Sequence, residues 1–441
     1  MGQLDLGILG NGSFSALVDQ QGRIVWCCLP RFDGDPVFSS LLAGDDEPAH
    51  GFYDVELEDC VKSEQRYLRN TAILSTILTD ARGGAIEILD FAPRYRERER
   101  IYRPLMLVRR VRPVAGDPTV RVRLRPAANY GERRAETTHG SNHIRYLLDD
   151  APMRLTTNAS VSYLLEERSF VLEEPIDLVL GPDESLDRAV GPFARHTFEE
   201  TRLYWFEWVR TLSVPFEWQS AVIRAAITLK LCNFEETGAI VAAVTTSIPE
   251  ARGSQRNWDY RYCWLRDAYF TIDALNHLGA TRTMEGFLRY IGNLVRNSDD
   301  GHLQPVYGIT QEARLTETQV GHLPGFRGHQ PVRVGNQAYE HIQNDVYGSV
   351  ILAATQSFFD ERLRAPGGTK LFERLEKVGE QAVKLFDQPD AGIWELRTRA
   401  RVHTFSALMC WAACDRLAKI AERVEREERR VYWQDQADHM H

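Results

Sequence analysis

The sequence predicts two kinds of structure in one chain, an antiparallel β-sandwich in the N-terminal part and a helical domain in the remainder. Two patterns indicate this division. Short runs of alternating apolar and polar residues, separated by Gly, Pro, Asn and Asp, fill residues 13–180. From about residue 198 the apolar residues recur at the helical period of about 3.6. A chain of 441 residues is also long enough for about two to three domains.

Several short runs in the first region have strand character, and antiparallel strands at this spacing are typical of a sandwich. Examples are residues 15–29, 72–80, 85–91, 105–114, 120–126, 144–150, 153–158 and 169–174. In the run 120–126, VRVRLRP, Val120, Val122 and Leu124 point to one side and three arginines to the other. The arginine side suits either an anion site or a solvated sheet face, and the solvated face is the more ordinary of the two.

The second region contains about seven segments with helical apolar stripes, which suit helices that pack on one another. They are residues 198–212, 216–234, 269–280, 281–297, 338–363, 370–386 and 404–425. Gly279 and the sequence Pro366-Gly367-Gly368 lie where helices are expected to stop. We therefore expect a β-sandwich domain in residues 1–190, a helical linker in 191–214 and a helical domain in 215–441.

Composition narrows the function classes. A net charge of −9 gives a nucleic-acid partner no electrostatic support. No run of about 18 apolar residues is present, so neither a transmembrane helix nor a membrane partner is expected. The N-terminal residues lack the features of a secretory signal, which favours a cytoplasmic location. The seven cysteines have neither disulfide-framework nor zinc-site spacing, and we expect reduced thiols and no metal site.

An aromatic and charged segment at residues 257–267, NWDYRYCWLRD, has the composition of a sugar site. The flat faces of Trp258, Tyr260 and Trp264 suit the apolar C–H side of a pyranose ring. Arg266 and Asp267 are able to form short, directional hydrogen bonds to sugar hydroxyls. From composition alone, an aromatic packing segment with a buried Arg–Asp pair is the commoner interpretation.

Two further segments contain candidate site residues. Glu395 follows Trp394 in a turn-rich stretch before a strongly helical one, and a carboxyl group desolvated by a tryptophan acquires the raised pKa that a general acid needs. Read alone, it is more typical of a surface glutamate beside a packed tryptophan. The Gly- and Pro-rich loop 323–336 carries Arg333 and Asn336, and by itself it is typical of a surface loop.

Other enzyme motifs are missing from the sequence. It contains no G-x-S-x-G, no Walker loop and no H-E-x-x-H. Gly7, Gly10 and Gly12 have neither the spacing nor the following helix of a dinucleotide-binding turn.

Taken together and in order, six motifs of the chain resemble glycoside hydrolase family 15, the glucoamylase and trehalase family. The segment RNWDYRYCWLRDA is the most specific of them, and the resemblance runs from Gly7 to about Ile420. The motifs are residues 11–42, 237–250, 256–268, 303–309, 331–348, and 392–397 with 403–416.

The resemblance implies a fold and an activity. The fold is a β-sandwich joined by a helical linker to an (α/α)6 barrel. The activity is exo-acting hydrolysis of α-glucosides with inversion at the anomeric carbon, on an α-linked glucose oligosaccharide or trehalose. This chemistry requires no metal and no cofactor.

The resemblance also implies roles for individual residues. Glu395 matches the general acid, and Arg266 with Asp267 matches the pair that binds hydroxyls of the terminal glucose. Tyr260 and Trp264 match aromatics that line the pocket. The remaining matches are Arg333 and Asn336 in a pocket loop, and Trp258 and Trp394, which we expect to line the cleft.

The chain departs from the family after Glu395. The family's general base is a glutamate far beyond the acid, whereas the late acidic residues here, within 422–428, form a charged helical face that does not match it. About seven helices also fall short of twelve, so we expect the barrel to be incomplete, with its last helices missing. A 441-residue form would then be nearly inactive and would either self-associate as a homo-oligomer or be poorly soluble.

Three functional hypotheses remain open at this point. The first is an α-glucoside hydrolase, in which glucoamylase-like action is placed ahead of trehalase-like action although no residue decides between them. The second is a catalytically inactive carbohydrate-binding or regulatory protein that keeps the glucose pocket but lacks the base. The third is a structural helical module, against which the sugar-pocket residues argue.

Overall fold

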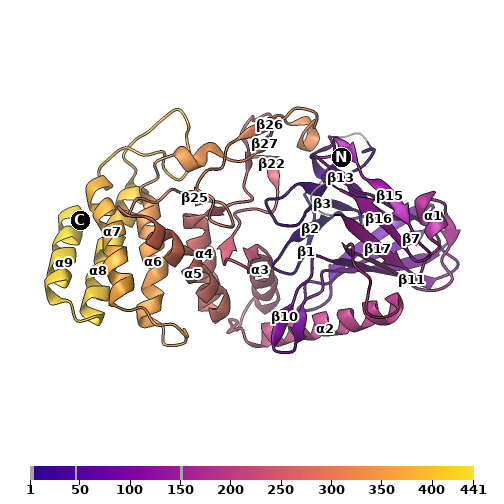
Figure 1. The fold of residues 1–441 in the computed structure, drawn as a ribbon, viewed down its shortest axis with the longest axis horizontal. Helices are drawn as coiled ribbons and strands as arrows, with labels where there is room; N and C mark the ends of the chain where they lie inside the picture. The colour runs from indigo at the N-terminus through magenta and orange to yellow at the C-terminus, as the bar shows by residue number, and fades with distance from the viewer. Residues whose placement is uncertain (1–3, 45–46, 149–151) are drawn as a thin grey trace. The chain divides into compact units, whose positions relative to one another are not determined.

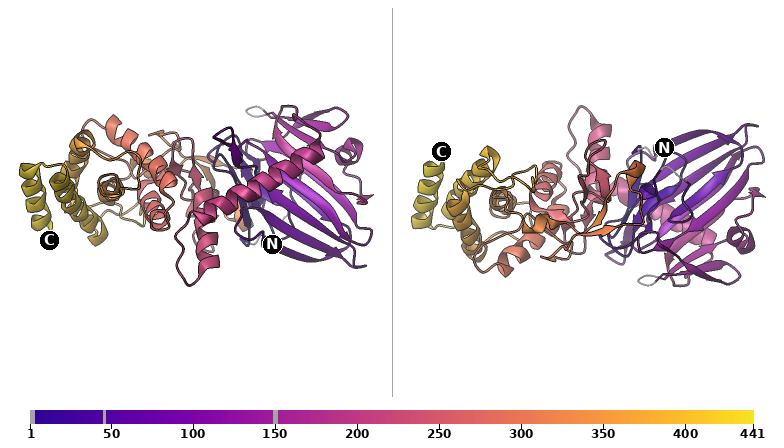
Figure 2. Two further views of the ribbon diagram at one scale, coloured as in Figure 1. Left: turned by 90° about the horizontal axis from the view of Figure 1, so that it is seen from below. Right: turned by 90° about the horizontal axis from the view of Figure 1, so that it is seen from above.

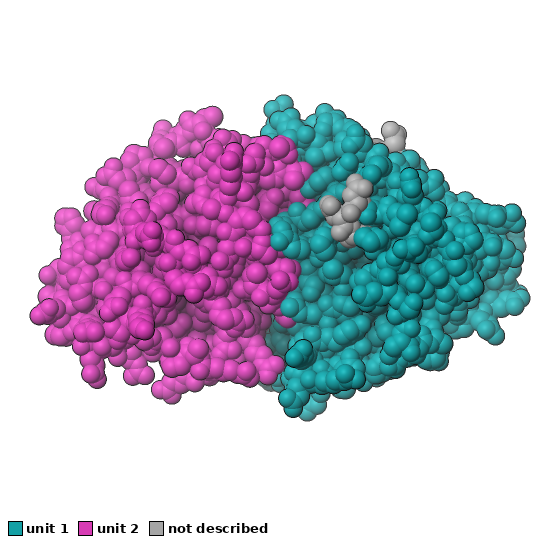
Figure 3. All heavy atoms as spheres, in the orientation of Figure 1, with its two compact units in different colours: residues 1–232, 244–258, 319–333 teal, residues 233–243, 259–318, 334–441 magenta. Residues whose placement is uncertain are grey.

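The structure, a computed structural model, describes residues 4–44, 47–148 and 152–441, so the last two residues of the predicted strand 144–150 lie outside the described part. The chain forms two units, coloured separately in Figure 3. Unit 1 comprises residues 1–232, 244–258 and 319–333, and unit 2 comprises 233–243, 259–318 and 334–441. Because two later segments belong to unit 1, the units do not follow a single boundary along the chain.

Unit 1 contains the predicted antiparallel β-sandwich (Figure 1). Its seven-stranded sheet has the order β1-β2-β3-β5-β12-β18 with β4 paired to β3, and its eight-stranded sheet has the order β15-β16-β17-β19-β11-β8-β7-β6. The strands of the first sheet are β1 (Gly7–Gly10), β2 (Ser15–Val18), β3 (Ile24–Cys28), β4 (Pro36–Phe38), β5 (Phe52–Leu57), β12 (Thr119–Arg125) and β18 (Phe170–Val171). Those of the second are β6 (Cys60–Tyr67), β7 (Leu74–Asp80), β8 (Ala85–Phe91), β11 (Leu107–Ala115), β15 (Glu136–His139), β16 (His143–Leu147), β17 (Met153–Thr157) and β19 (Ile176–Pro182).

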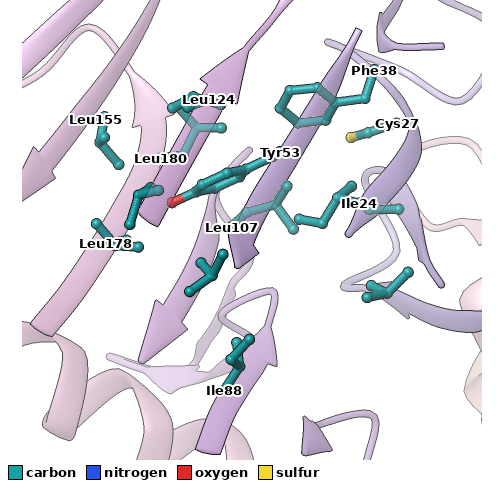
Figure 4. Close-up of a cluster of buried hydrophobic side chains, with 14 of the residues drawn as sticks. Ile24, Cys27, Phe38, Tyr53, Ile88, Leu107, Leu124, Leu155, Leu178 and Leu180 are labelled. Carbon is teal, nitrogen blue, oxygen red and sulfur yellow. The ribbon is translucent and has the colours of Figure 1, made fainter. Parts of the chain in front are cut away.

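The core of unit 1 is built from the inward residues of both sheets (Figure 4). Ile24 and Tyr53 from the first sheet belong to the same buried cluster as Ile88, Leu107 and Leu178 from the second. Each of these side chains is less than a tenth exposed. Because side chains alternate along a strand, the apolar residues of the period-2 pattern lie on one face of each sheet, and that face packs in this core.

The arginine side of β12 is a solvated face only in part, because Arg121 is exposed, as expected, whereas Arg123 is buried. Arg123 is 8% exposed and forms an ion pair with Asp54 of the neighbouring strand β5 at 2.9 Å. Arg121 and Arg123 also pair with Glu56 of the same strand. Cross-strand carboxylates therefore neutralise the arginines, a pairing that alternation within one strand does not reveal.

Unit 1 also contains two long helices. Helix α2 (Val190–Arg210) lies across the eight-stranded sheet, as the left view of Figure 2 shows, with Phe193 packed in a cluster that includes Phe91 and Val179. Helix α3 (Gln219–Leu231) packs Ile227 and Leu231 against Trp205 of α2. The short helix α1 (Val161–Leu165) lies between β17 and β18 in the chain.

Unit 2 is an array of α-helices with a mostly buried helix at its centre. Helix α6 packs on α4 and on α8, and α9 packs on α8. The described residues of this unit contain six α-helices, half the number in a closed (α/α)6 barrel. They are α4 (Leu265–His277), α5 (Thr281–Asn297), α6 (Asp345–Phe359), α7 (Thr369–Leu385), α8 (Thr404–Arg423) and α9 (Glu427–Met440).

The prediction of one helix over residues 338–363 was wrong at its start. Residues Gln337–Glu340 form a short 3-10 helix, and α6 begins only at Asp345. Asn336 caps the 3-10 helix, because its side chain accepts a hydrogen bond from the backbone N–H of Ala338 at 2.9 Å. The break leaves residues 341–344, which include Gln343, outside regular helix.

A close helix crossing in unit 2 gives a stability prediction. A Cβ atom added at Gly348 of α6 would lie 2.2 Å from the carbonyl oxygen of Met409 in α8, and backbone moves less readily than a side-chain end. We expect Gly348→Ala to lower the free energy of unfolding by about 1–3 kcal/mol, as overpacked core variants do.

Gly292→Ala is the matched control for that variant. Gly292 lies in α5 with nothing within 4 Å of an added Cβ, so alanine is expected to add about 0.5–1 kcal/mol through its helix propensity. Urea unfolding of both variants measures the effect. Equal shifts of the same sign would contradict the assigned crossing.

Candidate active site

Glu395 lies at the centre of a polar cluster in unit 2. Its side chain is 12% exposed, and its Oε1 atom accepts hydrogen bonds from Trp264 Nε1 at 2.6 Å and Gln343 Nε2 at 3.2 Å. Arg266 Nη2 lies 3.6 Å from the same oxygen. Trp264 directly precedes α4, Gln343 lies just before α6, and Glu395 comes from the loop between α7 and α8.

Arg266 links this glutamate to two further carboxylates. Its Nη1 donates to Gln343 Oε1 at 2.9 Å and to Asp345 Oδ2 at 3.3 Å, and its Nη2 lies 3.5 Å from Asp267. The Asp345 side chain is 1% exposed, whereas that of Asp267 is 47% exposed. Asp267 is therefore the acidic side chain of this cluster that is open to a ligand.

An aromatic wall accompanies the charged groups. The rings of Tyr260 and Trp264 lie 5.2 Å apart between centroids, and both belong to or pack on a cluster with Tyr262 and Val306. The structure thus brings Tyr260, Trp264, Arg266, Asp267 and Glu395 together, although Glu395 is distant from the others in the sequence. Trp264 is 1% exposed and contributes its indole N–H to the cluster, whereas the ring of Tyr260 is partly exposed and, beside directional charged groups, can bind a pyranose.

The protonation of Glu395 follows from its surroundings. Burial raises its pKa above the ordinary value, and this effect exceeds the opposing effects of the Arg266 charge and of the hydrogen bonds from Gln343 and Trp264. A carboxyl group that retains its proton at higher pH can act as a general acid.

The raised pKa also predicts how stability depends on pH. Because the folded state holds the Glu395 proton more tightly than the unfolded chain does, this group's contribution is full at low pH and is lost as pH rises from about 4.5 through the raised pKa. Glu395→Gln has no such proton to lose. We expect the variant to gain stability relative to the parent as pH rises through that window, measured by urea unfolding from pH 4 to 8. A difference that is independent of pH would contradict the raised pKa.

The loop that holds Glu395 is fixed by a buried aspartate. Asp390 is 1% exposed, and its carboxylate accepts hydrogen bonds from the backbone N–H of Asn344 at 2.7 Å, the hydroxyl of Ser406 at 2.7 Å and the backbone N–H of Gly392 at 3.1 Å. Glu395 itself has a left-handed φ of 51°. Such a backbone angle costs free energy in a non-glycine residue and persists where surrounding contacts enforce it.

The other candidate residues occupy different positions. Asn336, 2% exposed, donates to the backbone carbonyl of Asp259 at 3.0 Å, so it shapes its loop. Trp394 is 72% exposed. Arg333 and Trp258 belong to unit 1, where the guanidinium lies 4.4 Å from the centroid of the indole ring. Roles for these four residues in a sugar cleft stay predictions.

The segment 257–267 combines the two interpretations considered from its composition. Arg261 and Asp259 form a fully buried ion pair at 2.7 Å, which is the packing interpretation. Arg266 and Asp267 instead lie beside Glu395. One Arg–Asp pair of this short segment is therefore structural, and the other belongs to the candidate site.

Three residues of this region were not singled out from the sequence: Gln343, Asp345 and Asp390. The first two lie in the polar sequence Gln-Asn-Asp directly before the apolar stripe of α6. The signal in the sequence was this run of polar residues, which interrupts the apolar helical pattern. The interpretation of residues 338–363 as one continuous helix overlooked it. The acidic residues at 422, 425, 427 and 428 are exposed, as expected for a solvated face.

The comparison with known proteins decides the family. The profile of glycosyl hydrolases family 15 matches residues 218–441, half of the chain, and a trehalase-like N-terminal profile matches residues 4–170. The chain belongs to glycosyl hydrolase family 15. Its membership agrees with the antiparallel β-sandwich and the incomplete helical array described above.

Curated family 15 relatives are similar along most of the chain. The trehalase of Mycobacterium tuberculosis is 30% identical over 98% of the chain and 67% of its own length. The trehalase of Mycolicibacterium smegmatis is 31% identical over 95% and 66%, and trehalase 1 of Sulfolobus acidocaldarius is 30% identical over 95% and 71%. The chain thus spans about two thirds of the length of these relatives.

Two further findings concern the described residues only. None of their helices combines the length and hydropathy that a membrane crossing requires. Within the same residues, no group of three His, Cys, Asp or Glu side chains is arranged to hold a metal ion.

Proposed function

We propose that this family 15 chain hydrolyses an α-glucosidic bond and that trehalose is its preferred substrate. The observation that carries the proposal is Glu395, a buried carboxyl group with a raised pKa that contacts Trp264 and Arg266. The choice of trehalose over a maltose-type substrate is supported by the trehalase-like N-terminal match and by the names of the curated relatives.

The proposed chemistry begins with proton transfer. Glu395 donates its proton to the glycosidic oxygen as the bond to the anomeric carbon breaks, so that the leaving sugar departs as a neutral alcohol. Asp267 and Arg266 hold hydroxyls of the glucose that bears the reacting carbon. The partly exposed ring of Tyr260 provides apolar surface for the glucose ring.

Inversion requires a second carboxylate that activates water on the opposite face of the sugar. In inverting glycosidases the two carboxyl groups are about 6.5–9.5 Å apart, which leaves room for the water. We assign no base among the described residues. The exposed acidic residues within 422–428 are not proposed for this role.

Glucose release from trehalose, maltose and isomaltose tests the proposal, together with calorimetric binding of each sugar. Release of glucose from trehalose, with the α- and β-anomers formed in equal initial amounts in an NMR time course, supports the proposal, because the leaving sugar keeps its α configuration while the attacked sugar is inverted. Preferred release from maltose would overturn the substrate assignment. Sugar binding without release would favour a carbohydrate-binding protein, and neither binding nor release would overturn the proposal altogether.

A further inference from the structure

The two carboxyl oxygens of Glu395 have different hydrogen-bond partners. Trp264 Nε1, Gln343 Nε2 and Arg266 Nη2 all approach Oε1, at 2.6, 3.2 and 3.6 Å. Among the described residues, none donates a hydrogen bond to Oε2. One oxygen is thus surrounded by donors while the other is left for a different partner.

The orientation of the Gln343 amide follows from its other neighbour. Arg266 Nη1 lies 2.9 Å from one end of the amide, and a guanidinium only donates hydrogen bonds. The amide oxygen must therefore face Arg266, which directs the NH2 group toward Glu395. The assignment of the amide atoms is decided by chemistry at this position.

From this arrangement we propose that Gln343 is a positioning residue that, with Trp264, keeps Oε1 of Glu395 as a hydrogen-bond acceptor and so reserves Oε2 for the transferred proton. An indole N–H and an amide NH2 cannot accept a hydrogen bond. A hydroxyl at Oε1 would therefore face donors alone. The proton lies on Oε2, and Oε1 accepts the same bonds whether Glu395 is neutral or ionised.

The role of Gln343 deepens the proposed function, because it rests on Glu395 as the general acid. With the acid held at Oε1, the carboxyl group keeps one orientation before and after proton transfer, which lowers the reorganisation that the reaction requires. The charged groups that face Glu395 are Arg266, which lowers its pKa, and Asp267, which raises it. Asp345 acts on the cluster through its contact with Arg266.

The test follows the indole N–H of Trp264 by ¹⁵N–¹H NMR as pH is varied, which requires no turnover. Trp264→Phe identifies the resonance. We expect the Trp264 indole resonance to shift with pH as Glu395 titrates, and this shift to be absent in Glu395→Gln. At both ends of the titration the chemical shift should remain that of a hydrogen-bonded indole. A shift to the position of a free indole on protonation would place the proton on Oε1 and overturn the assignment.

Two variants test Gln343 itself. Gln343→Met removes the donor to the ionised form, so the Trp264 titration is expected to move up by about one pH unit. Gln343→Glu keeps the acceptor for Arg266, which protects the fold, and is expected to move the titration further in the same direction. Gln381→Met is the matched control, because this half-buried glutamine on α7 donates to the backbone carbonyl of Asp300 and not to Glu395, and it is expected to leave the Trp264 titration unchanged.

The outcomes separate this proposal from the proposed function. An unchanged titration in both Gln343 variants overturns the positioning role, whatever the chain hydrolyses. Absence of glucose release overturns the hydrolase proposal and leaves the titration readable. If trehalose is hydrolysed, Gln343→Met should lower kcat more than it changes KM and move the alkaline limb of the kcat profile upward, which a purely structural defect would not do.

Discussion

In any form of the protein that turns over trehalose, replacing Glu395 with Gln is expected to lower the rate constant for trehalose hydrolysis by about 10²–10⁴-fold, the usual contribution of a general acid. Gln has nearly the same shape but carries no transferable proton. The leaving sugar would then depart as an alkoxide, which is a poor leaving group. Glucose release at saturating substrate measures the effect, because the loss should appear in kcat.

A substrate with a good leaving group separates proton donation from substrate binding. α-Glucosyl fluoride needs little acid assistance, so Glu395→Gln should retain far more activity on the fluoride than on trehalose. Glu373→Gln, at an exposed position of α7, is the control and should keep full activity on both substrates. Equal losses on trehalose and the fluoride would show that Glu395 does not act as the acid.

Replacing Asp390 with Ala is expected to lower the free energy of unfolding of unit 2 by about 3–5 kcal/mol, the cost of leaving buried partners of a charged group unsatisfied. The carboxylate accepts hydrogen bonds from Asn344 at the start of α6, from Ser406 in α8 and from Gly392 in the Glu395 loop. Its loss therefore disconnects three elements at one point. Urea unfolding followed by tryptophan fluorescence measures the change.

Two companion variants make that result specific. Asp390→Asn keeps one acceptor oxygen and should recover part of the lost stability. Asp387→Ala removes an exposed aspartate from the same connection and should change the free energy of unfolding by less than about 0.5 kcal/mol. A small effect of Asp390→Ala, similar to that of Asp387→Ala, would show that the loop is held by other contacts.

Local patterns predicted the elements of this chain well where one periodicity dominates. Residues 281–297 form helix α5 with the predicted bounds, and the strand runs 85–91 and 153–158 correspond to β8 and β17. The continuous helix predicted over 338–363 was wrong at its start. There Asn336 caps a separate 3-10 helix, and the backbone N–H of Asn344 donates to Asp390 directly before α6 begins; such contacts are not visible in periodicity.

The sequence by itself determined the division into a strand region and a helical region, the apolar face of the elements that it predicted and the family to which the motifs point. These properties depend on residues that are near one another in the chain, since alternation and helical period are local. The strands β5, β6 and β19 were not among the runs that it singled out. The tertiary structure alone decided which charges neutralise each other. It buried Arg261 with Asp259 as a pair, placed Arg266 against Glu395, and joined Gln343 to one oxygen of that carboxylate. The pKa of an acid depends on burial and on neighbours distant in the chain, and only the packed fold supplies both.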